Sequence, residues 1–234
     1  MTYIIKSIIE LEDLINNREY VDNLIIDMNC DINHLLCNLT HLTYLKFKKG
    51  YNQPTDLFQL SNLQHLEFEY HYNQLTDFST LLNLTYLQFE KQYNQFTDLS
   101  KCTNLKYLKF DFDYNQLTDL SNLSNLTRLE FGIMYDQPTD LSKCTNLKYL
   151  EFLCYYDQLT DLSTLSNLEH LRFGHYYNQE KNLSMLSNLT YLKLYGMCNK
   201  SIDLTLCKKL KQLNDTHIEE LNLLTHSTGI FKKN

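Results

Sequence analysis

The sequence predicts an α/β repeat solenoid in which about ten coils of 21 residues stack into one curved, parallel β-sheet. Three observations carry this prediction. Leucine recurs every 21 residues from Leu42 to Leu210, and a second leucine follows three residues later, from Leu45 to Leu213. An aromatic column follows two residues further on, from Phe47 to Phe173. A single coil cannot bury its own apolar face, so stacked neighbours must share a continuous core.

Each coil reads N-L-x-x-L-x-F-x-x-x-Y-N-Q-x-T-D-L-S-x-L-x. Its segment x-x-L-x-F alternates, which is typical of a strand with one buried face. The segment T-D-L-S-x-L is too short for an α-helix, and it predicts a single 3₁₀ turn or irregular structure on the convex side.

The two ends of the chain differ from the repeat and are predicted to cap it. Residues 1–20 predict a strand over 3–6 and then a helix, because Ser7 and Glu10 have the spacing of a capping box. Residues 21–213 form the solenoid, with a degenerate first coil that starts at Val21. Residues 214–234 predict a C-terminal capping helix and a tail, because Thr216 and Glu219 repeat the spacing. Such polar-backed ends keep solenoids soluble.

Composition excludes several classes of protein. The 234 residues carry a net charge of −7, which argues against generic binding to nucleic acid or acidic membranes. No apolar run approaches the roughly 18 residues of a membrane span. The start of the chain lacks a secretory leader, and seven cysteines are an odd number, so we expect free thiols and an intracellular, cytoplasmic location. Alanine and tryptophan are missing, which indicates an AT-rich genome and says nothing about function.

The repeat also carries a family resemblance. The strand L-x-x-L-x-F/L and its return D-L-S-x-L-x-N-L resemble the leucine-rich repeat. The stretches Leu129–Pro138 (LEFGIMYDQP) and Leu171–Gln179 (LRFGHYYNQ) resemble the FNIP variety, L-x-F-G-x-x-F-N-Q-P, and the resemblance covers about residues 21–213. It implies a binding scaffold of the kind found in amoebae and giant viruses; a viral source would place the protein in the host cytoplasm. Some such scaffolds follow an F-box that connects to a ubiquitin ligase, but the first 20 residues are too few for one.

An acidic column is the first candidate for chemistry. It consists of Asp56, Asp77, Asp98, Asp119, Asp140, Asp161 and Asp203. Stacked carboxylates could bind calcium or act as acid and base, but calcium-binding coils supply glycine-rich turns and several oxygens per site. The favoured interpretation is that each aspartate caps the turn that follows it, because a feature copied seven times suits structure better than an active site.

The remaining polar columns also favour structure. The amides of the Y-N-Q segment and a second asparagine column, from Asn62 to Asn188, predict ladders that satisfy backbone groups. Cys102, Cys144 and Cys207 replace leucine in one core column, and no cysteine or histidine set has zinc spacing. Phosphate-loop and hydrolase motifs are missing as well. The sequence therefore predicts no cofactor and no metal.

The three positions after the strand phenylalanine change along the chain. They are polar in early coils, as in Lys48–Gly50, and become apolar in later ones, as in Gly132–Met134 and Leu153–Tyr155. If they are exposed, they form an interaction patch together with the tyrosine-rich strand face; alternatively, the loop folds inward and packs. The predicted partner-binding residues are Ile133, Met134, Tyr149, Leu153, Tyr155, Arg172, Tyr176, Tyr191 and Tyr195.

These observations predict a monomeric, non-enzymatic module that binds a protein partner through the concave sheet face and the rim of its C-terminal half. Two alternatives stay open. One is a calcium-dependent or enzymatic module that uses the aspartate column. The other is a structural repeat protein without a fixed partner.

Overall fold

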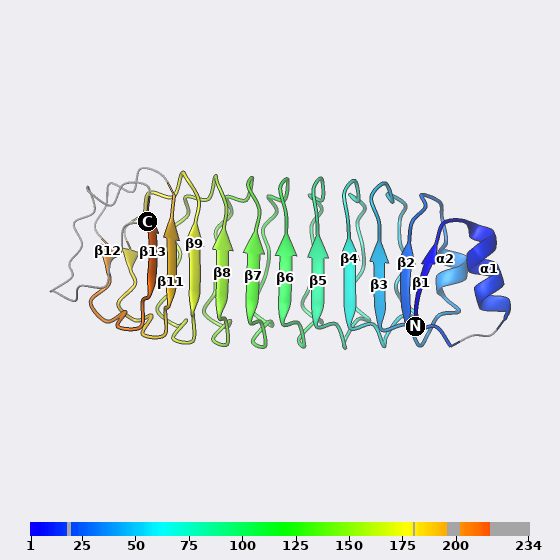
Figure 1. The fold of residues 1–234 in the computed structure, drawn as a ribbon, viewed down its shortest axis with the longest axis horizontal. Helices are drawn as coiled ribbons and strands as arrows, with labels where there is room; N and C mark the ends of the chain where they lie inside the picture. The colour runs from blue at the N-terminus through cyan, green and yellow to red at the C-terminus, as the bar shows by residue number, and fades with distance from the viewer. Residues whose placement is uncertain (18–19, 180, 196–201, 216–234) are drawn as a thin grey trace.

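The computed structural model describes residues 1–17, 20–179, 181–195 and 202–215, and the predicted C-terminal helix lies outside them. Two helices and thirteen strands occupy these ranges (Figure 1). Their bounds are β1 Thr2–Ile5, α1 Ile8–Asn16, β2 Asn23–Ile26, α2 Asn33–Leu36, β3 Tyr44–Phe47, β4 His65–Phe68, β5 Tyr86–Phe89, β6 Tyr107–Phe110, β7 Arg128–Phe131, β8 Tyr149–Phe152, β9 His170–Phe173, β10 Lys181–Asn182, β11 Tyr191–Leu194, β12 Ile202–Asp203 and β13 Gln212–Asp215.

Eleven of these strands form one parallel sheet in chain order, which runs along the long axis of the molecule (Figure 1). Each residue pairs with the residue 21 positions later, as Leu87 pairs with Leu108 and Phe89 with Phe110. The register confirms the predicted parallel solenoid. It also extends it, because β1 pairs with β2 in the same register, so the cap's strand belongs to the sheet. The strands β10 and β12 pair separately.

Alternation along each strand places the core on one side of the sheet. In β5, for example, Leu87 and Phe89 are buried while Tyr86 and Gln88 are half-buried. The phenylalanines stack from coil to coil, with ring centroids 5.0–5.9 Å apart. Each also stacks on the tyrosine four residues later, as Phe110 does on Tyr114 at 3.8 Å. The core is therefore a continuous double column of rings.

The buried tyrosines of the Y-N-Q segment need a partner for their hydroxyl groups, because burying an unpaired hydroxyl is costly. The threonine four residues later supplies it in the six coils from Tyr51 to Tyr156: Tyr93 and Thr97 lie 2.8 Å apart, and Tyr114 and Thr118 lie 2.7 Å apart. These threonines are themselves buried. The periodicity of the sequence shows both columns but not the hydrogen bond that joins them.

The spacing of equivalent rings shows which side of the solenoid is concave. The buried tyrosines are 6.0–6.1 Å apart from coil to coil. Rings on the solvent side of the sheet are only 3.9–4.4 Å apart. The coils therefore converge toward the solvent-facing side of the sheet, which is the concave side.

The return segment of each coil is a turn held by its aspartate. The N–H of Ser100 donates to Asp98 Oδ1 at 2.9 Å, and the N–H of Ser121 donates to Asp119 at the same distance. Single i→i+3 bonds follow, as from Cys102 N to Leu99 O at 2.9 Å. Six aspartates, from Asp56 to Asp161, make this bond, which confirms the capping interpretation for them.

Both predicted amide ladders are present, and they join neighbouring coils. Asn94 N donates to Asn73 Oδ1 at 2.9 Å, and Asn104 Nδ2 donates to the carbonyl of Leu82 at 2.8 Å. In the Y-N-Q ladder the backbone N–H groups that donate to the side-chain oxygens are exposed or half-buried, not fully buried. The main effect of these amides is therefore to fix the spacing of the coils; satisfying buried backbone groups is a smaller part of their role.

Helix α1 closes the N-terminal end of the solenoid (Figure 1). Ser7 is its N-cap and accepts a bond from Glu10 N at 3.3 Å. The Glu10 carboxylate bonds the N–H of Lys6 at 2.7 Å instead of that of Ser7, one residue away from a standard capping box. Leu11 and Leu14 are the buried residues of the helix.

Candidate partner-binding face

The concave side of the sheet carries an almost unbroken column of stacked rings, which we call the ring column. Its members are the first residues of β3 to β9 and of β11: Tyr44, His65, Tyr86, Tyr107, Arg128, Tyr149, His170 and Tyr191. Neighbouring rings are 3.9–4.4 Å apart and nearly parallel over most of the column. All eight side chains are half-buried because each covers the next.

One guanidinium continues the column where a ring is missing. The Arg128 guanidinium carbon lies 3.8 Å from the centroid of the Tyr149 ring and 5.7 Å from that of Tyr107. A cation over an aromatic face is attracted by the ring quadrupole. Arg128 Nε also donates a hydrogen bond to Glu130 at 2.5 Å, and this bond fixes the orientation of the guanidinium plane.

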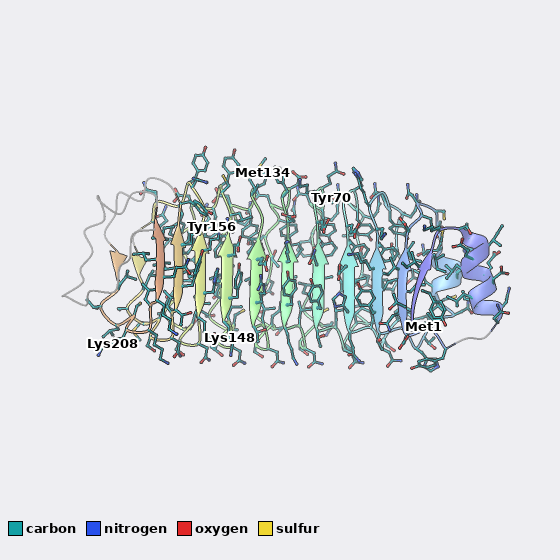
Figure 2. The ribbon with its side chains drawn as sticks, in the orientation of Figure 1. Met1, Tyr70, Met134, Lys148, Tyr156 and Lys208 are labelled. Carbon is teal, nitrogen blue, oxygen red and sulfur yellow. The ribbon has the colours of Figure 1, made fainter. Side chains whose placement is uncertain are left out.

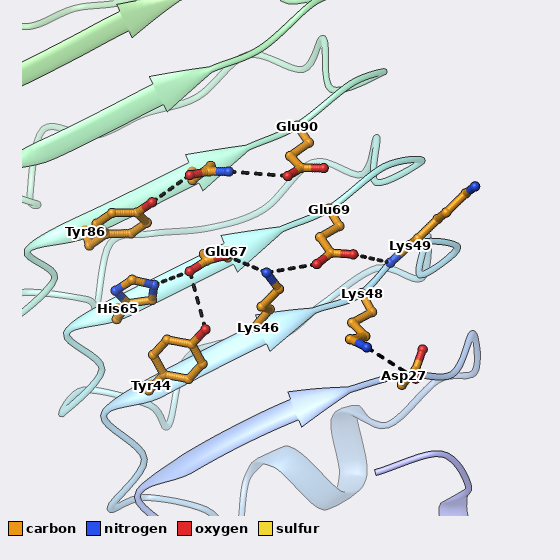
Figure 3. A network of polar contacts seen from close by, with 11 residues as sticks. Asp27, Tyr44, Lys46, Lys48, Lys49, His65, Glu67, Glu69, Tyr86 and Glu90 are labelled. Atoms are coloured by element: carbon orange, nitrogen blue, oxygen red, sulfur yellow. Dashed lines mark hydrogen bonds and ion pairs between the residues drawn. The ribbon is translucent and has the colours of Figure 1, made fainter. Parts of the chain in front are cut away.

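A column of charged side chains runs beside the rings. In its early part Lys46 lies between two carboxylates, at 2.9 Å from Glu67 and 2.8 Å from Glu69, while His65 bonds Glu67 at 2.5 Å (Figure 3). Burial raises the pKa of Glu67, but hydrogen bonds from His65 and Lys46 outweigh burial and lower it to about 2. This network is satisfied within the protein.

The later part of the charged column is arranged differently. Glu151 is buried, although alternation alone predicts that it faces solvent. It accepts hydrogen bonds from Tyr149 and from Arg172, the latter at 2.7 Å. The guanidinium of Arg172 also lies 5.0 Å from the ring of Tyr195, while its Nε is buried without a hydrogen-bond partner. The strand face therefore holds a half-buried cation, bonded to Glu151, in its C-terminal half.

His170 gives this face a pH dependence. Burial, together with the charges of Arg128 and Arg172, lowers the pKa of His170 from 6.5 to about 4. Between these values the unfolded chain binds more protons than the folded one, so stability should fall as the pH drops from 6.5 to 4. We expect His170→Phe, which keeps the stack on Tyr149 and Tyr191, to reduce this pH-dependent loss of stability. The measurement is the free energy of unfolding in urea at a series of pH values. An NMR titration midpoint of His170 near 6.5 would contradict the prediction.

The second element of the site is a short row of exposed side chains that we call the rim row. Met134, Tyr155 and Tyr176 follow β7, β8 and β9 at equivalent positions, and 42–57% of each is exposed. Figure 2 shows Met134 at the edge where the strands end, with Lys148 at the other edge. Tyr155 and Tyr176 stack at 4.9 Å.

Backbone hydrogen bonds hold the rim row from coil to coil. Met134 N donates to Phe112 O at 2.9 Å, Tyr155 N to Ile133 O at 3.0 Å, and Tyr176 N to Cys154 O at 3.0 Å. The loops are therefore ordered extensions of the sheet edge. Gly132 and Gly174 are buried in these loops, because each lies against the backbone of the preceding coil.

The structure divides the predicted residues between two neighbouring sets. Met134, Tyr155 and Tyr176 are exposed; the half-buried ones are Ile133, Tyr149, Leu153, Arg172, Tyr191 and Tyr195. The prediction omitted Arg128 and His170, which occupy the same column as Tyr149 and Tyr191. The 21-residue register places Arg128 and His170 in this column, but a sequence does not show the stacking distances that make them part of the surface.

Among the described residues no group of three or more histidine, cysteine, aspartate or glutamate side chains could hold a metal ion. Burial raises the pKa of Cys102 to about 12 and that of Cys144 to about 11, so neither thiol ionises at neutral pH. No disulfide joins the cysteines that the structure describes. Nor does any helix in the described ranges have the length and apolar character needed to cross a membrane.

The L-x-x-L-x-F strand, the asparagine ladders and the parallel stacking at 21 residues together define a leucine-rich repeat fold. No family model and no curated protein sequence matches the chain. Its similarity is to solved structures. The functional domain of InlJ from Listeria monocytogenes aligns with a TM-score of 0.63 and 20% identity over 92% of this chain. This chain spans 52% of the length of that domain.

Two other similar structures are receptors with bound ligands. The TLR13–ssRNA13 complex aligns with a TM-score of 0.54 and 21% identity over 90% of this chain. The plant peptide hormone receptor RGFR1, in complex with RGF2, gives 0.51 and 19% over 86%. This chain spans 33% and 35% of these receptor chains, respectively. At such identities the likeness establishes the fold alone.

Proposed function

We propose that this protein is a non-enzymatic recognition module that binds a segment of a protein partner across the ring column and the rim row. The observation that carries the proposal is that, in the C-terminal half, Arg172 and Tyr195 line the strand face between the ring column, where the strands begin, and the rim row, which follows the strand ends. There, half-buried Tyr149, His170 and Tyr191 lie at one end of the strands, half-buried Arg172 lies within β9, and the exposed rim row follows the other end of the strands. Tyrosine and arginine are the residues that most often dominate protein interfaces.

The stacking makes this surface suitable for binding. Side chains that are already held in place lose little conformational entropy when a partner docks. Tyr149 is fixed by His170 on one side at 4.1 Å and by Arg128 on the other at 3.8 Å. The surface is therefore preorganised, and binding energy is not used to order it.

The similar structures and the charge support a protein partner. RGFR1 holds the peptide hormone RGF2, whereas TLR13 holds a single-stranded RNA. A net charge of −7 disfavours the second kind of ligand, because binding to nucleic acid rests largely on cations that neutralise phosphates.

Three finer expectations belong to the same proposal. We place the repeat in the FNIP-like subtype on its L-x-F-G and Y-N-Q-P/L motifs, and we place the protein, as a monomer, in the cytoplasm, or in the host cytoplasm if its source is viral. The lack of disulfides among the described cysteines is compatible with a reducing compartment. The aspartate column is not proposed as a metal or catalytic site, because one carboxylate oxygen of each of six aspartates already accepts a backbone N–H.

The test is affinity capture with a variant that removes the exposed apolar groups of the rim. We expect Met134→Ser/Tyr155→Ser/Tyr176→Ser to lose the specific partner of the wild type at equal bait levels, because these side chains supply apolar contact without supporting the core. The measurement is quantitative mass spectrometry of the captured proteins, followed by titration of the purified partner.

Met185→Ser is the matched control. Met185 is exposed to a similar degree, on the return segment of its coil, so its replacement should leave capture unchanged. Unchanged capture by the triple variant would remove the rim row from the site. A wild-type protein that captures nothing specific would favour a structural repeat protein without a fixed partner.

A further inference from the structure

A second exposed apolar feature runs along the coils outside the proposed site, and we call it the apolar stripe. It is the position directly after the glutamine of the six Y-N-Q or Y-D-Q segments from Tyr51 to Gln158: Pro54, Leu75, Phe96, Leu117, Pro138 and Leu159. Its four large members are 60–76% exposed. These values exceed those of the rim row.

Packing does not explain the apolar stripe. The threonine that follows each member is buried and bonds the core tyrosine, while the stripe residue points outward. The stripe also has ends, because the equivalent positions before and after it are Asn33 and Glu180. A continuous exposed apolar row of this length marks an interaction site on a soluble protein.

A row of carboxylates accompanies the apolar stripe. The segment is extended, with an exposed–buried–exposed pattern, so the aspartate two residues after each stripe residue lies on the same face, about 6.5–7 Å away. The row runs from Asp56 to Asp161, and each of its members is exposed. Hydrogen bonds from the N–H and hydroxyl groups of serine lower the pKa of Asp98, Asp119, Asp140 and Asp161, so these carboxylates are charged at neutral pH.

The spacing of the coils can be compared with the repeats of a helix and of a strand. The buried tyrosines three residues before the stripe repeat every 6.0–6.1 Å. Four residues of an α-helix advance about 6.0 Å, whereas two residues of a strand advance about 6.6–6.8 Å. Because an α-helix turns every 3.6 residues, residues four apart also drift about 40° round its axis, so a helix that lies along the solenoid matches two or three neighbouring coils at a time. Six coils measure about 30 Å, the length of about 20 helical residues.

We propose that the apolar stripe docks a basic amphipathic helix of a protein partner. The helix lies lengthwise, with its apolar side chains on the stripe and its lysine or arginine side chains against the aspartate row. This surface shares no residue with the ring column or the rim row, so it adds a second contact to the function proposed above. A second copy of the chain does not suit the stripe, because it would bring its own acidic row and a net charge of −7.

The probes are two 20-residue helical peptides that share one leucine face. One carries lysines beside that face and the other carries glutamates at the same positions. We expect the wild type to bind the lysine peptide at least tenfold more tightly in fluorescence anisotropy, and to lose affinity as salt is raised. Phe96→Ser/Leu117→Ser should weaken this binding at least tenfold, because it removes the centre of the stripe.

Two further variants separate charge from folding. Asp98→Asn/Asp119→Asn keeps the turns, because an asparagine oxygen can still accept the serine N–H, and it should weaken binding severalfold and reduce its salt dependence. Leu82→Ser, an exposed leucine on another column, should leave binding unchanged, as should the triple rim variant. The triple rim variant tests only the proposed function, so its result distinguishes failure of that function from failure of the apolar stripe as a docking site.

Three binding results would overturn the inference: equal affinity for the two peptides, no binding of the lysine peptide, or full binding by Phe96→Ser/Leu117→Ser. Sedimentation over a range of concentrations provides the remaining check. A wild-type dimer that Phe96→Ser/Leu117→Ser converts to a monomer would assign the stripe to a second copy and reject a partner helix.

Discussion

Replacing Phe110 with alanine is expected to lower the free energy of unfolding by about 3–5 kcal/mol, the usual cost of removing a buried phenylalanine. Phe110 is fully buried and stacks on Phe89 at 5.4 Å, on Phe131 at 5.9 Å and on Tyr114 at 3.8 Å. Its loss opens a cavity in the middle of the double column of rings. The neighbouring coils cannot close it, because two amide ladders fix their spacing. Urea unfolding followed by circular dichroism measures the change.

Phe112→Ala is the matched control in the same coil. Phe112 is only half-buried and lies 5.5 Å from the ammonium group of Lys91, so its removal should cost much less than that of Phe110. Equal losses for the two variants would show that stability does not depend on the double column of rings in the core. A Phe110→Ala loss below about 1 kcal/mol would show that the coils repack around the cavity.

The periodicity of the sequence was sufficient to predict the fold. Leucine at two fixed positions and phenylalanine at a third determine the strand, its buried face and its register, because each coil has the same length. The aspartate turn was predictable for a related reason. A local hydrogen bond from a backbone N–H two residues later, as from Ser100 to Asp98, depends only on neighbours in sequence.

The candidate site was less predictable because it depends on contacts between coils. The burial of Glu151 follows from its bonds with Tyr149 and Arg172, one of which comes from the next coil. The role of Arg128 depends on two stacking distances, 3.8 Å and 5.7 Å, that a sequence does not contain. The apolar stripe was visible as a column of proline, leucine and phenylalanine, but only the structure shows that the column is exposed.

Gly132→Ala is expected to destabilise the protein by about 1–3 kcal/mol, the range for overpacked sites. A Cβ atom at Gly132 would lie 2.4 Å from the carbonyl carbon of Asp111 and 2.6 Å from the nitrogen of Phe112. Both contacts are with backbone, which cannot rotate away as a side chain can. Alanine also lowers the entropy of the unfolded chain, which alone would stabilise by about 0.4–1 kcal/mol, so the clash must exceed this gain. Urea unfolding measures the sum.

The same substitution tests whether the rim loops are held by their approach to the preceding coil. The clash falls on Phe112, whose carbonyl accepts the N–H of Met134 at 2.9 Å, so relief of the clash must move the first member of the rim row. Asp111→Ala is the control, because this equivalent residue of the preceding coil already has a Cβ atom and is half-exposed; its change should stay within about 0.5 kcal/mol. If Gly132→Ala is neutral or stabilising, the loop after β7 lies farther from the preceding coil than the 2.4 Å between a Cβ atom at Gly132 and the carbonyl carbon of Asp111 implies. A destabilised variant that also binds the partner more weakly than Asp111→Ala would link the glycine to the geometry of the rim row.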